Sequence, residues 1–274
     1  MKKVVVLFIL FISLYPICFI LIGSFIGNFE VKTYLSALND GSKSHDYQLF
    51  IFPKYLTLSA YVALLLDTPS FFVAFWNSFK STILITVGQL LVNLPAAWWF
   101  YRVTFKGKNI IFNLYILLMV LPFVVLMVPQ YMILKQMQLL DTLGAVILPG
   151  IFYTLAVFII TPYFRDIPKS VIEYAVLEGA NEWQLFTKIG LPFATKGIMI
   201  AIVLNFIDYW GSFESTMTYI KNKSLWNLPM YIMMLKVDNM TLIFVSVVVA
   251  MVVPIAILYS CREFLIGGLT IADK

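Results

Sequence analysis

The sequence is poor in charged residues and in the residue types that build metal and disulfide sites. Only 12% of its 274 residues are Asp, Glu, Lys or Arg, and it has two cysteines and one histidine. Cys18 and Cys261 cannot form a disulfide framework, so we expect both to act as small core hydrophobes. His45 has no partners with metal-ligand spacing and is expected to be a solvated loop residue. The sequence therefore predicts no metal site and no disulfide scaffold.

What the sequence has instead is apolar residues, which make up 61% of the chain, including 24 phenylalanines. The mean hydropathy of +0.92 excludes an ordinary soluble domain. A helix needs roughly 20 apolar residues to cross a bilayer. Six runs of that kind occur: Val4–Ile26, Ser81–Tyr101, Asn109–Leu134, Leu143–Tyr163, Gly197–Ile220 and Met240–Cys261. We therefore expect an all-α membrane protein with six transmembrane helices.

The amino terminus has the basic flank and apolar core of a signal peptide, with Lys2 and Lys3 before the first run. The apolar run continues to Ile26, so we interpret it as an uncleaved first helix. With six spans, the segments on the side of Lys2 carry most of the lysines and arginines, above all the short loop "RVTFKGK" (102–108). By the positive-inside rule, both termini are expected to be cytoplasmic.

These assignments divide the chain into segments. We expect a first transmembrane helix over 1–27, an extracytoplasmic loop over 28–70, a transmembrane domain over 71–262 and a cytoplasmic tail over 263–274. Within the domain, a polar cytoplasmic loop over 164–193 separates the fourth run from the fifth.

This loop reads "FRDIPKSVIEYAVLEGANEWQLFTKIGLP" and predicts two short helices. Pro168 suits a first helical position, and Gly179 is suited to end that helix in a left-handed turn. Asn181 can cap the second helix, with Gln184 placed to complete a capping box. The second helix is expected to stop at Gly190 and Pro192 before the fifth span.

The first helix is expected to be amphipathic, because Val171, Ile172, Ala175 and Val176 form an apolar stripe. A helix that lies on the inner leaflet usually has a basic polar face, whereas residues 173–191 contain three glutamates and a single lysine. The pattern therefore favours a helix that docks in a protein groove.

The same residues resemble the "EAA" loop of ABC importer permeases. The resemblance rests on Glu173, Ala175, Gly179-Ala180 and Leu191-Pro192, and it is strongest to sugar-type permeases related to the second membrane subunit of the maltose importer. Similar segments include "FFVAFWNS", "LLDTLGAVILPGIFYTLAVFI", "FIDYW" and "REFLIGGLT", so about 200 residues are covered. The resemblance implies a type I ABC importer permease fold.

It also implies a function: half of the translocation pathway for a sugar or oligosaccharide in a bacterial or archaeal cytoplasmic membrane. The implied partners are a second permease, two ATPase subunits that bind ATP and Mg, and an extracytoplasmic solute-binding protein. The implied ATPase-coupling residues are Glu173, Ala175, Glu178, Gly179, Ala180, Leu191 and Pro192. The sequence itself has no G-x-x-x-x-G-K-[ST] motif and no catalytic triad, so we expect no ATP site and no enzyme activity in this chain.

A few polar residues interrupt the spans. Asp208 lies in the fifth run and shares a helical face with Asn205, Ser212 and Ser215, a face unlikely to contact lipid. Gln89 and Asn93 are likewise polar residues inside the second run. Structural contacts and a pathway-lining role are both open for these residues, and for Trp210, which could stack on a sugar. The competing functions are a self-contained six-helix carrier or channel, and an ABC permease for another solute.

Overall fold

The computed structural model describes residues 2–39, 54–236 and 239–269, and these residues fold almost entirely into helices. Within those ranges the β pairing is limited to an isolated bridge between Ile26 and Leu56. The expected all-α class is confirmed, as the hydrogen-bonding demands of an apolar environment require. His45 and the last five residues of the expected tail lie outside the described residues.

The chain divides into two units, and the first combines residues 1–76 with residues 226–253. The end of the first helix packs on the last one in this unit, because the ring of Phe244 fills the space beside Gly23. Side chains from Val4 to Tyr15 are exposed. The elements of the unit are α1 (Lys2–Gly23), α2 (Asn28–Asn39), α3 (Ser59–Leu66), the start of α4 (Pro69–Arg102), α14 (Leu228–Met233) and the first part of α15 (Met240–Leu269).

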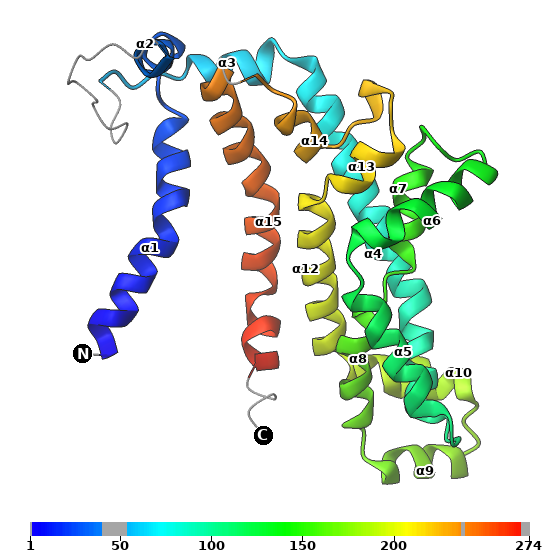
Figure 1. The fold of residues 1–274 in the computed structure, drawn as a ribbon. Coiled ribbons are helices and arrows are strands. Elements are labelled where there is room, and N and C mark those ends of the chain that lie inside the picture. Colours follow the sequence, from blue (N-terminus) through cyan, green and yellow to red (C-terminus); the bar gives the residue numbers. More distant parts are fainter. Residues whose placement is uncertain (1, 40–53, 237–238, 270–274) are drawn as a thin grey trace. The chain divides into compact units, whose positions relative to one another are not determined.

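The second unit, residues 77–225 and 254–274, contains the polar loop and most of the buried core. In Figure 1, α8, α9 and α10 gather at the end of this unit opposite α7 and α13. Its helices, besides the rest of α4 and α15, are α5 (Lys108–Val120), α6 (Phe123–Gln136), α7 (Gly144–Ile151), α8 (Leu155–Arg165), α9 (Lys169–Leu177), α10 (Glu182–Gln184), the π-helix η1 (Leu185–Gly190), α11 (Leu191–Phe193), α12 (Thr195–Gly211), α13 (Glu214–Tyr219) and the 3-10 turn η2 (Lys223–Leu225).

Small residues bring α8 and α12 together. Ala156 and Ala201 are fully buried, and the ring of Tyr163 occupies the space where Gly197 would carry a Cβ. Close backbone approach of this kind gives membrane helices their packing energy, because lipid is as apolar as the side chains themselves.

Four described helical stretches are long and apolar enough to cross a membrane: Lys3–Gly23, Pro69–Arg102, Gly144–Arg165 and Met240–Leu265. Two further stretches qualify only as bent pairs, α5 with α6 and the 182–193 segment with α12. The described residues thus provide four candidate spans, or up to six if each bent pair counts as one.

The third, fourth and fifth predicted runs are not continuous helices, contrary to our expectation. The fourth is interrupted at residues 152–154, between α7 and α8. The third breaks at Leu121 and Pro122, both extended, and α5 and α6 diverge by 96°. Proline disfavours helical geometry at the residue before it and offers no N–H for the ladder. The fifth ends at Gly211, and extended Ser212 leads to the separate helix α13.

Candidate functional site

The first half of the polar loop is the amphipathic helix α9. Pro168 is its N-cap residue, so the helix begins one position later than predicted. Ile172 is buried, and Val171 and Ala175 pack against the core, as the apolar stripe predicted. Val176 does not belong to the buried stripe as predicted, because its side chain is 49% exposed.

The turn after α9 has the predicted left-handed glycine. Gly179 has φ +85°. Its N–H donates to the carbonyl of Val176, and the N–H of Ala180 donates to the carbonyl of Ala175, both at 3.0 Å. These two bonds form a Schellman motif, which satisfies the last carbonyls of the helix and fixes the direction in which the chain leaves it.

The second half begins with the predicted capping box. Asn181 Oδ1 accepts from the Gln184 N–H at 2.9 Å, and Gln184 Oε1 accepts from the Asn181 N–H at 3.0 Å. The helix does not stop at Gly190 as predicted, since it continues through η1 and α11. It ends at Phe193, one residue beyond Pro192 and before α12, from which it is bent by 73°. The turn before Pro192 is wound as a π-helix, so the missing N–H of Pro192 falls where the hydrogen-bond ladder is already irregular.

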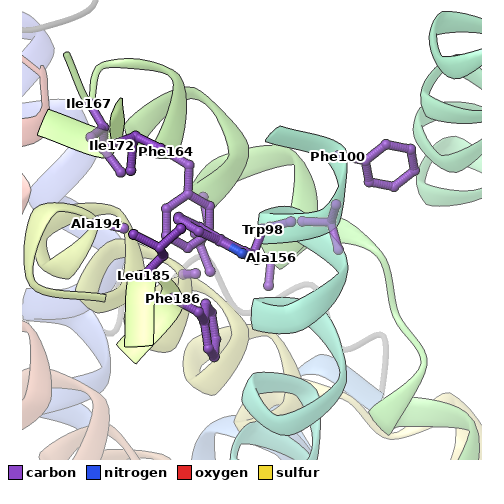
Figure 2. Packing of buried hydrophobic residues seen from close by; sticks show 13 residues of the cluster. Trp98, Phe100, Ala156, Phe164, Ile167, Ile172, Leu185, Phe186 and Ala194 are labelled. Atoms are coloured by element: carbon purple, nitrogen blue, oxygen red, sulfur yellow. The ribbon is translucent and has the colours of Figure 1, made fainter. Parts of the chain in front are cut away.

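The loop rests on an aromatic cluster at the end of α4. Figure 2 shows the side chains of Trp98, Phe164, Leu185 and Phe186 close together, so α4 and the loop both contribute to this cluster. The Trp98 ring lies edge-on to Phe164 at 5.2 Å between centroids and 5.7 Å from Phe186. Gly190 contacts this tryptophan so closely that a Cβ would lie 2.6 Å from its ring. The loop is thus packed onto the helices as part of one core.

An ion pair adds to this packing at the outer edge. Arg102, the last residue of α4, donates from Nη2 to Glu182 Oε1 at 2.5 Å and from Nε to Oε2 at 3.2 Å. Glu182 is held in the first turn of α10 by the capping box before it.

The loop presents apolar side chains away from the core. Tyr174 is 67% exposed, Leu177 85% and Trp183 69%. Sequence reasoning did not single out Leu177 or Trp183, although both are apolar residues off the buried stripe, which was the available signal. We call this surface, made of Tyr174, Val176, Leu177 and Trp183, the exposed loop face.

Four of the seven predicted coupling residues line a groove in the loop. Ala175, Glu178, Gly179 and Ala180 line this groove of about 410 Å³, together with Tyr174, Gln184, Lys188 and Ile189. Glu173 is exposed on α9, and Leu191 and Pro192 lie farther along, in α11.

A second hollow, of about 540 Å³, lies where three helix breaks meet. We call it the polar cavity. The break between α5 and α6 contributes Leu121 and Phe123, and the break between α7 and α8 contributes Gly150 and Tyr153. The break after α12 contributes Gly211, Ser212, Glu214 and Ser215. Asp208 and Glu214 are its acidic residues, and the described residues that line it include no lysine or arginine.

The structure places the predicted pathway residues in different surroundings, some in the cavity wall and some in the buried core. Asp208 and Ser212 both line the polar cavity. Trp210 is buried and stacks on Phe206 at 5.7 Å between ring centroids, and Asn205 is also buried. Because α12 ends at Gly211, Ser212 and Ser215 do not continue its polar face as predicted.

Gln89 and Asn93 are buried in α4 and hold the break between α7 and α8. Gln89 Nε2 donates to the Gly150 carbonyl at 2.7 Å, and Asn93 Nδ2 donates to the Tyr153 carbonyl at 2.9 Å. The Gly150 carbonyl also accepts from the Tyr153 N–H and the Tyr209 hydroxyl, both at 3.3 Å, so the side-chain amides add to the hydrogen bonds at this helix break. The two amides therefore support the wall of the polar cavity.

No group of three or more His, Cys, Asp or Glu side chains that could hold a metal occurs in the described part of the chain.

Comparison with known proteins identifies relatives along most of the chain. A family model described as "binding-protein-dependent transport system inner membrane component" matches residues 89–267. The chain is 27% identical over 267 residues to the arabinooligosaccharides transport system permease protein AraQ of Halalkalibacterium halodurans, covering 96% of this chain and 92% of that protein. It is 29% identical over 225 residues to the sulfoquinovosyl glycerol transport system permease protein SmoH of Agrobacterium fabrum, covering 80% and 78%.

A solved structure shares the fold. A bacterial ABC transporter involved in the import of the acidic polysaccharide alginate superposes with a TM-score of 0.77 at 19% identity, covering 96% of this chain and 94% of that one.

Proposed function

We propose that this chain, which belongs to the family of binding-protein-dependent transport system inner membrane components, forms half of the translocation pathway of a sugar importer. Family membership makes it the membrane-spanning permease component of an ABC importer, which is a transport subunit and not an enzyme. The observation that carries the rest of the proposal is the polar cavity formed where three helix breaks meet.

The topology we propose has six spans with both termini in the cytoplasm. Four spans are supplied by α1, by α4, by α7 with α8, and by α15. The bent pair of α5 and α6 supplies the third span in chain order. α12 crosses as the fifth, while the 164–193 loop stays outside the bilayer. The excess of basic residues on the side of this loop supports this orientation.

The loop is the proposed docking element for separate ATPase subunits, which would bind the ATP and Mg. Its exposed loop face suits a protein partner, because large apolar side chains in a polar loop gain free energy when a partner covers them. The groove beside Gly179 offers a concave surface for a partner side chain. The other proposed partners are a second permease and an extracytoplasmic solute-binding protein.

The polar cavity suits an uncharged sugar. Carboxylate, hydroxyl and amide groups from Asp208, Ser212, Glu214 and Gln130 can hydrogen-bond to sugar hydroxyls, and Tyr153 offers an aromatic face. Two carboxylates with no lysine or arginine in the described lining disfavour an anionic sugar. The relatives AraQ and SmoH are both named for the transport of carbohydrate derivatives, which supports the sugar class. Sulfoquinovosyl glycerol carries a sulfonate, so the preference for an uncharged sugar rests on the cavity lining alone.

The test is uptake by the assembled importer in vesicles. We expect ATP-dependent uptake of a neutral oligosaccharide delivered by the binding protein, and poor uptake of uronate or sulfonate analogues. The chain reconstituted alone is the control and should transport nothing. Uptake by the chain alone along an ion gradient would identify a carrier, whereas ATP-dependent uptake confined to a solute other than a sugar would overturn only the substrate class.

A further inference from the structure

The ion pair between Arg102 and Glu182 joins two parts of the chain that the proposed mechanism must connect. Arg102 ends the 34-residue helix α4, and Glu182 begins the second half of the proposed docking loop. Both oxygens of the carboxylate receive a hydrogen bond from the guanidinium. This bidentate geometry fixes orientation as well as distance.

A cleft lies beside the packed contact between α4 and the loop. One turn before Arg102, Trp98 packs against Phe186 and Gly190. Beside it lies a largely apolar cleft of about 540 Å³, lined by Trp98, Trp99, Arg102, Glu182, Trp183 and others. The ion pair adds a directed polar contact to this packing and fixes the loop in register with the end of α4.

The other end of this section of α4 holds the polar cavity. Gln89 and Asn93 donate to the carbonyls of Gly150 and Tyr153, two residues of the cavity wall. At 1.5 Å per residue, Gln89 lies roughly 20 Å along the helix from Arg102. α4 continues through Pro95 as a single helix. One continuous helix therefore contacts the loop at Arg102 and the cavity wall at Gln89 and Asn93.

We propose that Arg102 is a positioning residue for transport: its ion pair with Glu182 makes α4 move with the loop, and α4 carries that movement to the cavity wall. The inference rests on the proposed function of the loop as the ATPase docking element. We assign ATPase docking to the exposed loop face, and neither Arg102 nor Glu182 belongs to that face. Loss of the ion pair should therefore uncouple ATP hydrolysis from transport without releasing the ATPases.

A charge-swap experiment tests this in the assembled importer. The variants are Arg102→Glu, Glu182→Arg and the double swap, with Lys106→Glu as a matched control that makes the same charge change four residues beyond Arg102. The readouts are the amount of co-purified ATPase and the sugar taken up per ATP hydrolysed. Each single reversal should keep wild-type amounts of ATPase and lower uptake per ATP about two- to fivefold, the range for a partly exposed ion pair. The double swap should restore most of this loss, and the control should match wild type.

A single reversal with wild-type uptake per ATP, or a double swap no better than the singles, would overturn the proposal. If a reversal variant fails to fold, Arg102→Gln and Glu182→Gln remove the charge with less disturbance and carry the same expectation. Asn93→Leu should also lower uptake per ATP, and its effect should be less than additive with that of Arg102→Gln if both act through α4. Fully additive effects of Asn93→Leu and Arg102→Gln on uptake per ATP would contradict a shared action through α4.

The proposed docking function has its own test, so the two failures are distinguishable. Leu177→Asp places a charge on the exposed loop face and should release the ATPases. Retention of the ATPases with wild-type uptake would refute docking through this face. Release by Leu177→Asp, combined with wild-type coupling in the Arg102 variants, would refute only the inference about α4.

Discussion

Replacement of Gly179 by alanine isolates the contribution of one backbone conformation to ATPase docking. Gly179 has φ +85°, and no atom lies within 4 Å of the position that its Cβ would occupy. Alanine would therefore meet no neighbour in this chain. An L-residue in a left-handed conformation costs about 1–2 kcal/mol. The substitution thus introduces strain without a steric clash inside the permease.

The strain acts on the geometry of the docking loop. Gly179 supplies one of the two Schellman bonds, and together they set the direction from α9 to the capping box at Asn181. The strain of about 1–2 kcal/mol destabilises the docking-competent conformation of the loop relative to conformations in which residue 179 is no longer left-handed. A free-energy change of about 1.4 kcal/mol changes a binding constant tenfold. The affinity of the permease for the ATPase should therefore fall by about 5- to 30-fold if the full strain is relieved in this way.

The assay is a titration of the ATPase subunit against the permease pair in detergent or vesicles, together with uptake. Gly179→Asn is the matched control, because asparagine tolerates the left-handed conformation far better than alanine while adding a larger side chain. We expect Gly179→Ala and Gly179→Val to weaken binding and Gly179→Asn to be close to wild type. Wild-type affinity in Gly179→Val would refute a coupling role for this turn, and equal losses in the alanine and asparagine variants would point to direct contact with the ATPase instead of strain.

Three further predictions test the cavity and the loop. Asp208→Asn preserves shape and removes one of two cavity carboxylates, so uptake of the neutral sugar should change while the importer still assembles; if even Asp208→Leu transports normally, the pathway role is refuted. Asn181→Ala should lower the stability of the loop by about 1 kcal/mol in thermal unfolding of the purified importer, with Asn181→Asp as a capping control expected to match wild type. Gly190→Ala should destabilise by about 1–3 kcal/mol because its Cβ would overlap Trp98, and unchanged thermal stability would show that the tryptophan can move aside.

The features of the loop that depend on neighbouring residues could be predicted from the sequence. The left-handed Gly179 and the reciprocal bonds of Asn181 and Gln184 both follow from residues at most three positions apart, and the structure has both. Local hydrogen bonds of this kind need no knowledge of the tertiary fold.

The end of the second loop helix depends on contacts that the local sequence does not reveal. Gly190 reads as a stop signal, yet it lies in a helical conformation, and its lack of a Cβ leaves room for the ring of Trp98. The exposure of Val176 is a similar case, since the stripe spans more of α9 than the core beneath it can cover. A glycine kept for packing and a glycine kept for a turn look the same in a single sequence.

The helix breaks were the largest gap between sequence and structure, and they create the polar cavity. An apolar run gives the same hydropathy signal whether it forms a straight helix or two helices bent by 96°. Extended backbone at Leu121 and Ser212 exposes polar groups, which at membrane depth are tolerated only beside protein or a water-lined cavity. Breaks in different helices therefore stabilise one another when they meet at a shared hollow. Asp208 lines that hollow from the last turn of α12, and Ser212 lines it from the break that follows.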